Sequence, residues 1–219
     1  MGTPLRFIAR GRVLSDVSWL NAEGFDEVGL FVDDGACPSP EFIHNAGIQY
    51  AVLFPFNDAS NGPGTFGDAY AGYMQTVRSV GWDMVGGGGV SGDIVRVAMN
   101  YMSWCNYEND VYAPPYNHPT SGPDTYHVDY VDTIDSMEQA VAIGNCAEVG
   151  IRIGLDDVIS PATTWIEMID TARAQGIPCN NVCFYNTRNT DVVAILKTDA
   201  YEVLLGITKY YGIRHKIRG

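Results

Sequence analysis

Three short apolar runs that end in aspartate constrain the fold of this chain more than any other feature. The runs are Val28–Val32, Ala51–Phe56 and Gly150–Leu155, and Asp33-Asp34, Asn57-Asp58 and Asp156-Asp157 follow them. Continuous apolar strands of this length are typical of a parallel sheet with helices on both faces. In such sheets ligands bind at the carboxyl ends of the strands, so these aspartates are predicted to stand at a site.

The remaining segments alternate between strand-like and helix-like patterns. Strands are predicted at residues 5–10, 28–33, 49–56, 82–85, 126–132, 148–155 and 181–185, and residues 201–211 are interpreted as an eighth strand or a terminal helix. Helices are predicted at residues 15–21, 39–47, 68–80, 94–104, 137–146, 160–175 and 191–197. This alternation predicts one compact α/β domain over residues 1–219, a (β/α)8 TIM-like barrel whose last helix can be absent. An open doubly wound sheet and a seven-stranded barrel remain alternatives.

The charge of the chain excludes several partners. Its net charge is −13, with 18 Asp, 8 Glu and only three Lys, which argues against nucleic acid or an anionic membrane as a partner. An acidic, Asp-rich, Lys-poor surface indicates a halophilic source, archaeal or viral. No apolar run is long enough for a membrane span, and early arginines interrupt any signal peptide. An extracellular, cell-surface or virion-associated location is favoured.

Metal and thiol chemistry find little support in the sequence. The five cysteines are scattered and form no CxxC pair, so we expect buried thiols. His118 and His127, with Asp129 or Glu108 nearby, are weak candidates for a divalent-metal site. No cofactor is therefore predicted.

Paired carboxylates at a barrel mouth suit glycoside hydrolysis, in which one acid protonates the leaving oxygen and a second carboxylate attacks or activates water. We expect Asp33 and Asp157 to be the catalytic couple, with Asp34 and Asp58 as positioning groups. An aspartate after a strand can instead cap the next helix.

Sugar rings stack on aromatic side chains, and an irregular loop rich in Tyr, Asn and Pro occupies residues 105–125 or so. The predicted substrate-binding residues, in and outside that loop, are Trp104, Tyr107, Glu108, Tyr116, Tyr185 and Asn186. The predicted function is therefore a carbohydrate-active hydrolase acting on a polysaccharide or cell-surface glycan. The alternative is a non-catalytic surface, virion or carbohydrate-binding barrel. Basic residues cluster in the last eleven positions and could contact an acidic subunit, giving a homo-oligomer or another assembly.

One stretch resembles a known family. The segment Phe31–Gly35 followed by Pro38, Pro40 and Gly47-Ile48, and later Pro114–Tyr116, are similar to motifs of the polysaccharide deacetylases, which are metal-dependent barrel hydrolases. The resemblance implies a catalytic base at Asp33 and a metal ligand at Asp34. The family's pair of metal-binding histidines is missing, because Gly86–Val90 stands in that place, and Ala113 replaces an arginine. A deacetylase-like enzyme is thus a third reading of the function.

Overall fold

The computed structural model describes residues 4–33, 36–56, 76–77, 79–88, 105–108, 128–131, 148–156 and 158–213. The strands in these ranges are β1 (Arg6–Val13), β2 (Phe25–Asp33), β3 (Tyr50–Phe56), β4 (Met84–Gly88), β5 (Cys105–Glu108), β6 (Val128–Val131), β7 (Glu148–Gly154) and β8 (Cys179–Asp191). The helices labelled in them are α1 (Val17–Ala22), α2 (Glu41–His44), α6 (Ala162–Ala174), α7 (Val192–Lys197) and α8 (Tyr201–Tyr211).

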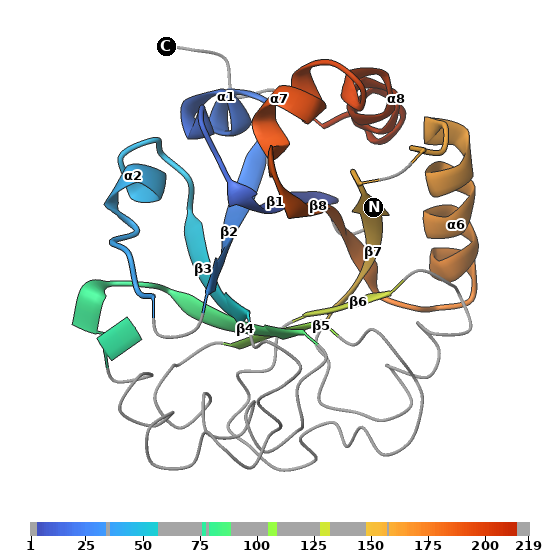
Figure 1. The fold of residues 1–219 in the computed structure, drawn as a ribbon. Coiled ribbons are helices and arrows are strands. Elements are labelled where there is room, and N and C mark those ends of the chain that lie inside the picture. The colour runs from blue at the N-terminus through green and yellow to red at the C-terminus, as the bar shows by residue number, and fades with distance from the viewer. Residues whose placement is uncertain are drawn as a thin grey trace.

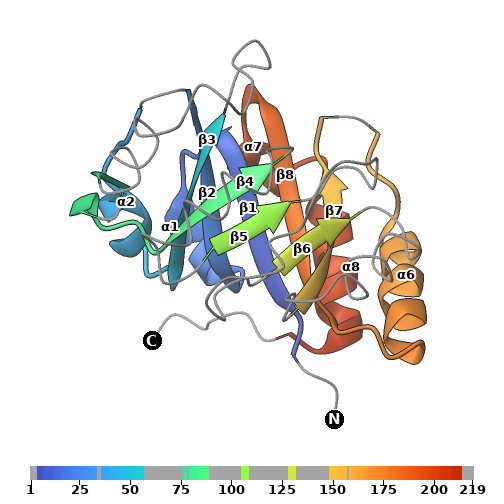
Figure 2. The same cartoon turned by 90° about the horizontal axis from the view of Figure 1, so that it is seen from below.

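The strands form one parallel sheet that curls into a barrel. Their hydrogen-bonded order is β5-β4-β3-β2-β1-β8-β7-β6, and the pairings are parallel. The two ends of this order, β5 and β6, lie side by side (Figure 2). The strands therefore surround a common axis, with the helices outside them (Figure 1). The predicted (β/α)8 barrel is confirmed.

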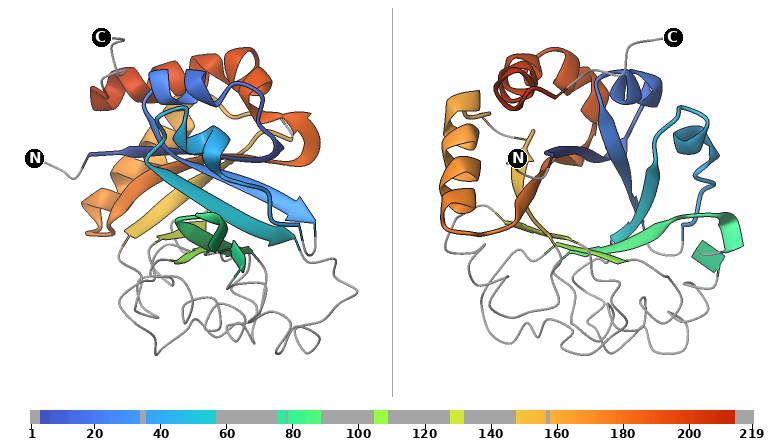
Figure 3. Two further views of the ribbon diagram at one scale, coloured as in Figure 1. Left: turned by 90° about the vertical axis from the view of Figure 1, so that its left-hand side faces the viewer. Right: turned by 180° about the vertical axis from the view of Figure 1, so that it is seen from behind.

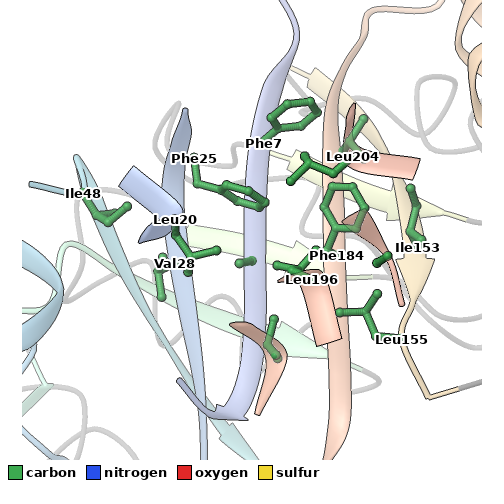
Figure 4. Close-up of a cluster of buried hydrophobic side chains, with 14 of the residues drawn as sticks. Phe7, Leu20, Phe25, Val28, Ile48, Ile153, Leu155, Phe184, Leu196 and Leu204 are labelled. Atoms are coloured by element: carbon green, nitrogen blue, oxygen red, sulfur yellow. The ribbon is translucent and has the colours of Figure 1, made fainter. Parts of the chain in front are cut away.

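The main core lies between the outer face of the sheet and the helices. The rings of Phe7, Phe25 and Phe184 meet with centroids 5.6 to 6.1 Å apart, and all three are fully buried. Leu196 of α7 and Leu204 of α8 belong to the same buried cluster (Figure 4). Figure 3 shows α1, α7 and α8 gathered over one side of the barrel. Burial of these side chains is the main term that holds the helices to the sheet.

The inner face of the barrel is unusually polar near β1 and β2. Side chains alternate between the two faces of a strand, so Phe7 and Ala9 face the helices while Ile8 packs with Cys183 inside. Arg10 shares the inner face, is fully buried, and lies with its guanidinium 3.5 Å from Glu27.

A glycine makes room for that arginine. A Cβ on Gly29 would lie 2.8 Å from Cγ of Arg10 and 2.7 Å from the ring of Phe54. Arg10 can therefore cross β2 and place its guanidinium carbon 4.3 Å from the Phe54 ring centroid. A charged side chain is in this way accommodated inside the barrel by an ion pair and an aromatic face.

The structure differs from the prediction at one segment and decides between the two alternatives for another. Residues 105–108, expected at the start of an irregular loop, form strand β5, and the rest of that loop lies outside the described residues. Residues 201–211 form helix α8, so the last helix, which the sequence left open, is present. Its apolar side chains Val203, Leu204 and Ile207 recur at helical spacing and are buried on one face. A strand would have divided them between both faces.

Candidate functional site

The carboxyl ends of β1, β7 and β8 place four polar side chains together, and we call Arg12, Asp156, Thr187 and Arg188 the mouth cluster. These three strands are neighbours in the sheet (Figure 1). Gly154, the last residue of β7, pairs with Tyr185 of β8, and Thr187 stands two residues further along β8, on the same face as Tyr185. Asp156 follows the end of β7 by two residues, and its hydrogen bonds with Thr187 place both at the rim of the barrel interior.

Thr187 holds Asp156 in place. The backbone N–H and the hydroxyl of Thr187 both donate to Oδ2 of Asp156, at 3.1 and 2.9 Å. The Asp156 side chain is only 15% exposed, and its other oxygen, Oδ1, is buried without a hydrogen bond among the described residues. Nε of Arg188 lies 4.0 Å from that oxygen. Asp156 is thus an oriented carboxylate with one buried oxygen that accepts no hydrogen bond among the described residues.

Arg12 joins the mouth cluster from β1. Its Nε donates to the carbonyl oxygen of Thr187 at 3.1 Å, so Thr187 is held on one side by Arg12 and holds Asp156 on the other. Guanidinium groups are well suited to bind carboxylates and phosphates, because their planar N–H donors match two oxygens at once. The mouth cluster therefore combines a carboxylate with two cations.

The loops behind the mouth cluster are tied to each other. Asp191 caps α7 by accepting from the N–H of Val193 at 3.1 Å and also accepts from the N–H of Ser15 at 3.1 Å. Asp16, the cap of α1, accepts from Nζ of Lys197 at 2.7 Å. This hydrogen bond from Lys197 lowers the pKa of Asp16 to about 2. The connections after β1 and β8 are thereby fixed relative to each other.

The structure describes the side chains of only two of the predicted site residues, Tyr185 and Asn186. Asp33 is the last residue of β2, and Tyr107 and Glu108 lie in β5, but the structure does not describe their side chains. The predicted residues outside the described ranges are Asp34, Asp58, Asp157, Trp104, Tyr116, His118 and His127. The predicted roles of all these residues remain predictions.

The two predicted residues on β8 lie on opposite faces. Tyr185 packs with Ile8 and Cys183 inside the barrel. Asn186 is fully buried, donates to Oγ1 of Thr190 at 2.5 Å and accepts from the N–H of Arg188 at 2.7 Å. Asn186 therefore shapes the connection that carries Arg188.

Sequence reasoning missed Arg12, Thr187 and Arg188 as site residues. Thr187 and Arg188 follow the apolar part of β8, as the aspartates follow their apolar runs. The predicted strand ended at Tyr185, whereas β8 runs to Asp191, and of the residues after Tyr185 only Asn186 was assigned to the site. Extending the rule for strand ends from aspartate to any polar residue would have found them.

Two further features concern metals and membranes. Within the described ranges, no three His, Cys, Asp or Glu side chains are arranged to hold a metal ion. None of the helices in this part of the chain is long and apolar enough to cross a membrane.

Comparisons with known proteins place the fold. No family model matches the chain, and no curated protein matches it either. Among solved structures, the phosphoribosyl anthranilate isomerase of Thermus thermophilus is similar with a TM-score of 0.54 and 10% identity, over 96% of this chain and 100% of that chain. The tryptophan synthase complex of Pyrococcus furiosus is similar with a TM-score of 0.50 and 11% identity, over 96% of this chain and 97% of that chain.

A third similar structure is a designed cube-shaped protein cage built by fusing symmetric oligomeric domains. Its TM-score is 0.59 and its identity 10%, and the match covers 96% of this chain and 74% of that chain. At such identities the likeness concerns the fold.

The prediction of a carbohydrate-active hydrolase is wrong. The similar enzymes are an isomerase and a synthase named for tryptophan, and neither is a glycoside hydrolase or a deacetylase. Of what the deacetylase-like motif at Phe31–Gly35 implied, the comparisons support only the barrel fold. The physical reason is that a polar residue after a buried strand marks the ligand-binding end of any such barrel, whatever the chemistry. What this chain shares with these structures is a TIM-like (β/α)8 barrel.

Proposed function

We propose that this chain is an isomerase-type enzyme that moves a proton within a small anionic substrate bound at the mouth cluster. The observation that carries the proposal is the state of Asp156. Two donors from Thr187 orient the carboxylate through Oδ2, while buried Oδ1 has no hydrogen bond among the described residues. A fixed carboxylate with one oxygen that accepts no hydrogen bond among the described residues is suited to act as a general base, once a substrate that enters beside Arg188 reaches that oxygen.

The arginines of the mouth cluster favour an anionic substrate. Arg188 lies beside Asp156 and its side chain is 64% exposed, so it can turn to a ligand that enters from solvent. Arg12 is partly exposed at the same rim. The chain has a net charge of −13, so two arginines at the ligand-binding end of the strands form a local region of positive charge. Such a region attracts an anionic ligand.

The similar isomerase supports this substrate class. By its name it acts on phosphoribosyl anthranilate, which carries a phosphate and a carboxylate. In many barrels a phosphate binds at the loops after the last two strands and at the N-terminus of a short helix. Here the carboxylate of Asp191 occupies the N-terminus of α7. We therefore favour a carboxylate over a phosphate as the group that the arginines bind.

The reaction that fits these groups is proton transfer next to a carbonyl or imine. Oδ1 of Asp156 would remove a proton from carbon and return it to a neighbouring carbon or heteroatom. General base catalysis of this kind contributes about 100-fold to 10,000-fold in rate.

Solvent exchange tests the proposal without knowledge of the product. The protein is incubated in deuterated buffer with a panel of small carboxylates and sugar phosphates, and carbon-bound deuterium is followed by NMR. We expect exchange into at least one carboxylate, and a loss of about 100-fold or more in Asp156→Asn. The control Asp199→Asn changes an exposed aspartate between α7 and α8 and should exchange at the wild-type rate.

Binding is measured separately by the rise in unfolding temperature that the same compounds cause. Asp156→Asn should keep that rise, whereas Arg188→Gln should reduce it and the exposed control Lys209→Gln should not. Absence of both exchange and stabilisation across the panel would overturn the proposal.

A further inference from the structure

The inner faces of β7 and β8 below the mouth cluster hold a tyrosine in an uncommon position. Arg152 and Gly154 share the inner face of β7, and Asp156 follows two residues after Gly154, where the strand ends. Tyr185 of β8 pairs with Gly154. A Cβ added to Gly154 would lie 3.4 Å from the Tyr185 hydroxyl, so the phenol ring lies against Gly154 with its oxygen over β7.

Arg152 supports the tyrosine from below. Its guanidinium carbon lies 5.0 Å from the centroid of the Tyr185 ring. Arg152 is 8% exposed, whereas Tyr185 and Gly154 are both partly exposed. Solvent thus reaches the tyrosine from the mouth, and the arginine lies deeper in the barrel.

The other neighbours of Tyr185 are also defined. Arg10 of β1 is its register partner on the opposite side, and the Arg10 guanidinium points to Glu27, 3.5 Å away. Cys183, two residues earlier on β8, packs against the ring together with Ile8. The charged residues that flank Tyr185 on β1 and β7 are therefore Arg10 and Arg152, and Asp156 follows the end of β7.

We propose that Tyr185 is a second catalytic residue, which protonates the substrate oxygen while Asp156 removes a proton from carbon. This inference rests on the proposed function. The C–H electron pair becomes the new carbon–carbon double bond, and the carbonyl oxygen takes the phenol proton. The product of this step is a neutral enol, with a protonated Asp156 and a tyrosinate. With an α-hydroxy carbonyl substrate this enol is an enediol: protonated Asp156 then delivers its proton to the former carbonyl carbon, and the tyrosinate takes the proton of the neighbouring hydroxyl group, which becomes the new carbonyl. Both enzyme groups return to their starting state, and the isomerisation needs no oxidant or co-reactant.

The two residues stand close enough to contact one small substrate. Asp156 lies two residues beyond Gly154, past the end of β7, so the two Cα atoms are at most about 7 Å apart. A carbon acid and its adjacent carbonyl oxygen span less than that distance. The guanidinium of Arg152 would stabilise the tyrosinate through its positive charge, in the way that fixed cations stabilise developing oxyanions in enzyme sites.

The test compares Tyr185→Phe with Tyr210→Phe. Tyr210 lies on α8, is 58% exposed and donates to Asp170, so its variant controls for loss of a phenol hydroxyl. In the deuterium-exchange assay we expect Tyr185→Phe to lower kcat by about 100-fold or more with little change in KM. Its rate should also lose the decrease at alkaline pH that ionisation of a catalytic phenol causes. Tyr210→Phe should match the wild type.

Separate outcomes identify which proposal fails. If the wild type exchanges, Asp156→Asn does not, and Tyr185→Phe equals the wild type, then the role of Tyr185 is refuted while the proposed function stands. If Tyr185→Phe only lowers the unfolding temperature or raises KM and keeps the alkaline decrease, the tyrosine is a packing residue and the inference is refuted. If no compound exchanges with the wild type, the proposed function itself fails.

Discussion

Glu27 is the residue on which the charge balance of the barrel interior depends. It is fully buried, lies 3.5 Å from Arg10, and also lies 3.8 Å from Nη2 of Arg6. Removal of one partner from a buried ion pair leaves a charge without compensation in a medium of low dielectric constant. The aromatic faces of Phe54 and Tyr50 next to the two guanidinium groups cannot replace a carboxylate.

We therefore predict that Glu27→Gln lowers the free energy of unfolding by about 3 to 5 kcal/mol. The measurement is urea denaturation, with the midpoint shifted and the slope unchanged. The double variant Arg10→Met with Glu27→Leu should be more stable than Glu27→Gln, because both charges are removed together. A loss below about 1 kcal/mol, the range of exposed pairs, would contradict the prediction.

Sequence reasoning predicted the position of one residue of the mouth cluster. Asp156 was expected at the mouth because it follows an apolar strand, and the structure places it there. Arg10 and Glu27 were not expected inside, since charged residues in strands are normally assigned to solvent. Arg6 and Arg10 do alternate with Phe7 and Ala9, but only the covering helices show that both faces of β1 are buried.

Among the elements, the contact between α6 and α8 depends on a glycine. A Cβ on Gly206 of α8 would lie 2.6 Å from Cβ of Ala162 at the start of α6, which is closer than two carbons can pack. Alanine has a better helix propensity than glycine by about 1 kcal/mol, so in an exposed helix the substitution would stabilise.

At this contact we predict the opposite sign. Gly206→Ala should lower the free energy of unfolding by about 1 to 3 kcal/mol, because the two helices must move apart. The compensating variant Ala162→Gly with Gly206→Ala should recover most of that loss in a double-mutant cycle measured by denaturant unfolding. Additive effects of the two substitutions would show that the contact does not exist.

The link between α1 and α7 predicts a pH dependence. The hydrogen bond from Lys197 lowers the pKa of Asp16 from 3.8 to about 2. A pKa lower in the folded chain than in the unfolded chain means that the interaction stabilises the fold above about pH 4. That stabilisation is lost as the pH falls to about 2.

Lys197→Met should therefore be less stable than the wild type near neutral pH, and the difference should shrink between about pH 4 and pH 2. Thermal unfolding over this pH series measures it. Because both side chains are about 40% exposed, the difference should be small and should decrease in salt. A difference that is constant with pH would contradict this assignment.

Two segments, one assigned wrongly and one left open between strand and helix, show what a single sequence lacks. Residues 105–108 form a strand of only four residues with mixed polarity, which no periodicity of a single sequence can separate from a loop. Its pairing with β4, where Cys105 lies opposite Val85, is a contact between distant segments. The segment 201–211 was left open between strand and helix. Its buried side chains follow a helical period, but which side chains are buried is known only once the face that packs on the barrel is known.

For the whole molecule, the dominant property is a net charge of −13. Several of the few arginines lie inside the barrel or at its mouth, so they do not offset the negative charge over the rest of the surface. Like charges on the surface repel one another and favour the expanded chain. Salt shortens the range of this repulsion, from about 10 Å at 0.1 M to about 3 Å at 1 M. The buried pair of Arg10 and Glu27 lies at 0% exposure and is screened much less.

We accordingly predict that the protein is more stable at about 1 M KCl than at about 0.1 M KCl. For a chain of this length each kcal/mol corresponds to about 2 to 4 °C in Tm, and we expect a rise of at least that size near neutral pH. The pI of about 4.5 supplies the control, because close to that pH the net charge vanishes and the rise should vanish with it. A rise of equal size at both pH values would assign the effect to general salting-out of apolar surface. A decrease in Tm at neutral pH would mean that attractive pairs, such as Asp16 with Lys197, outweigh the repulsion of the acidic surface.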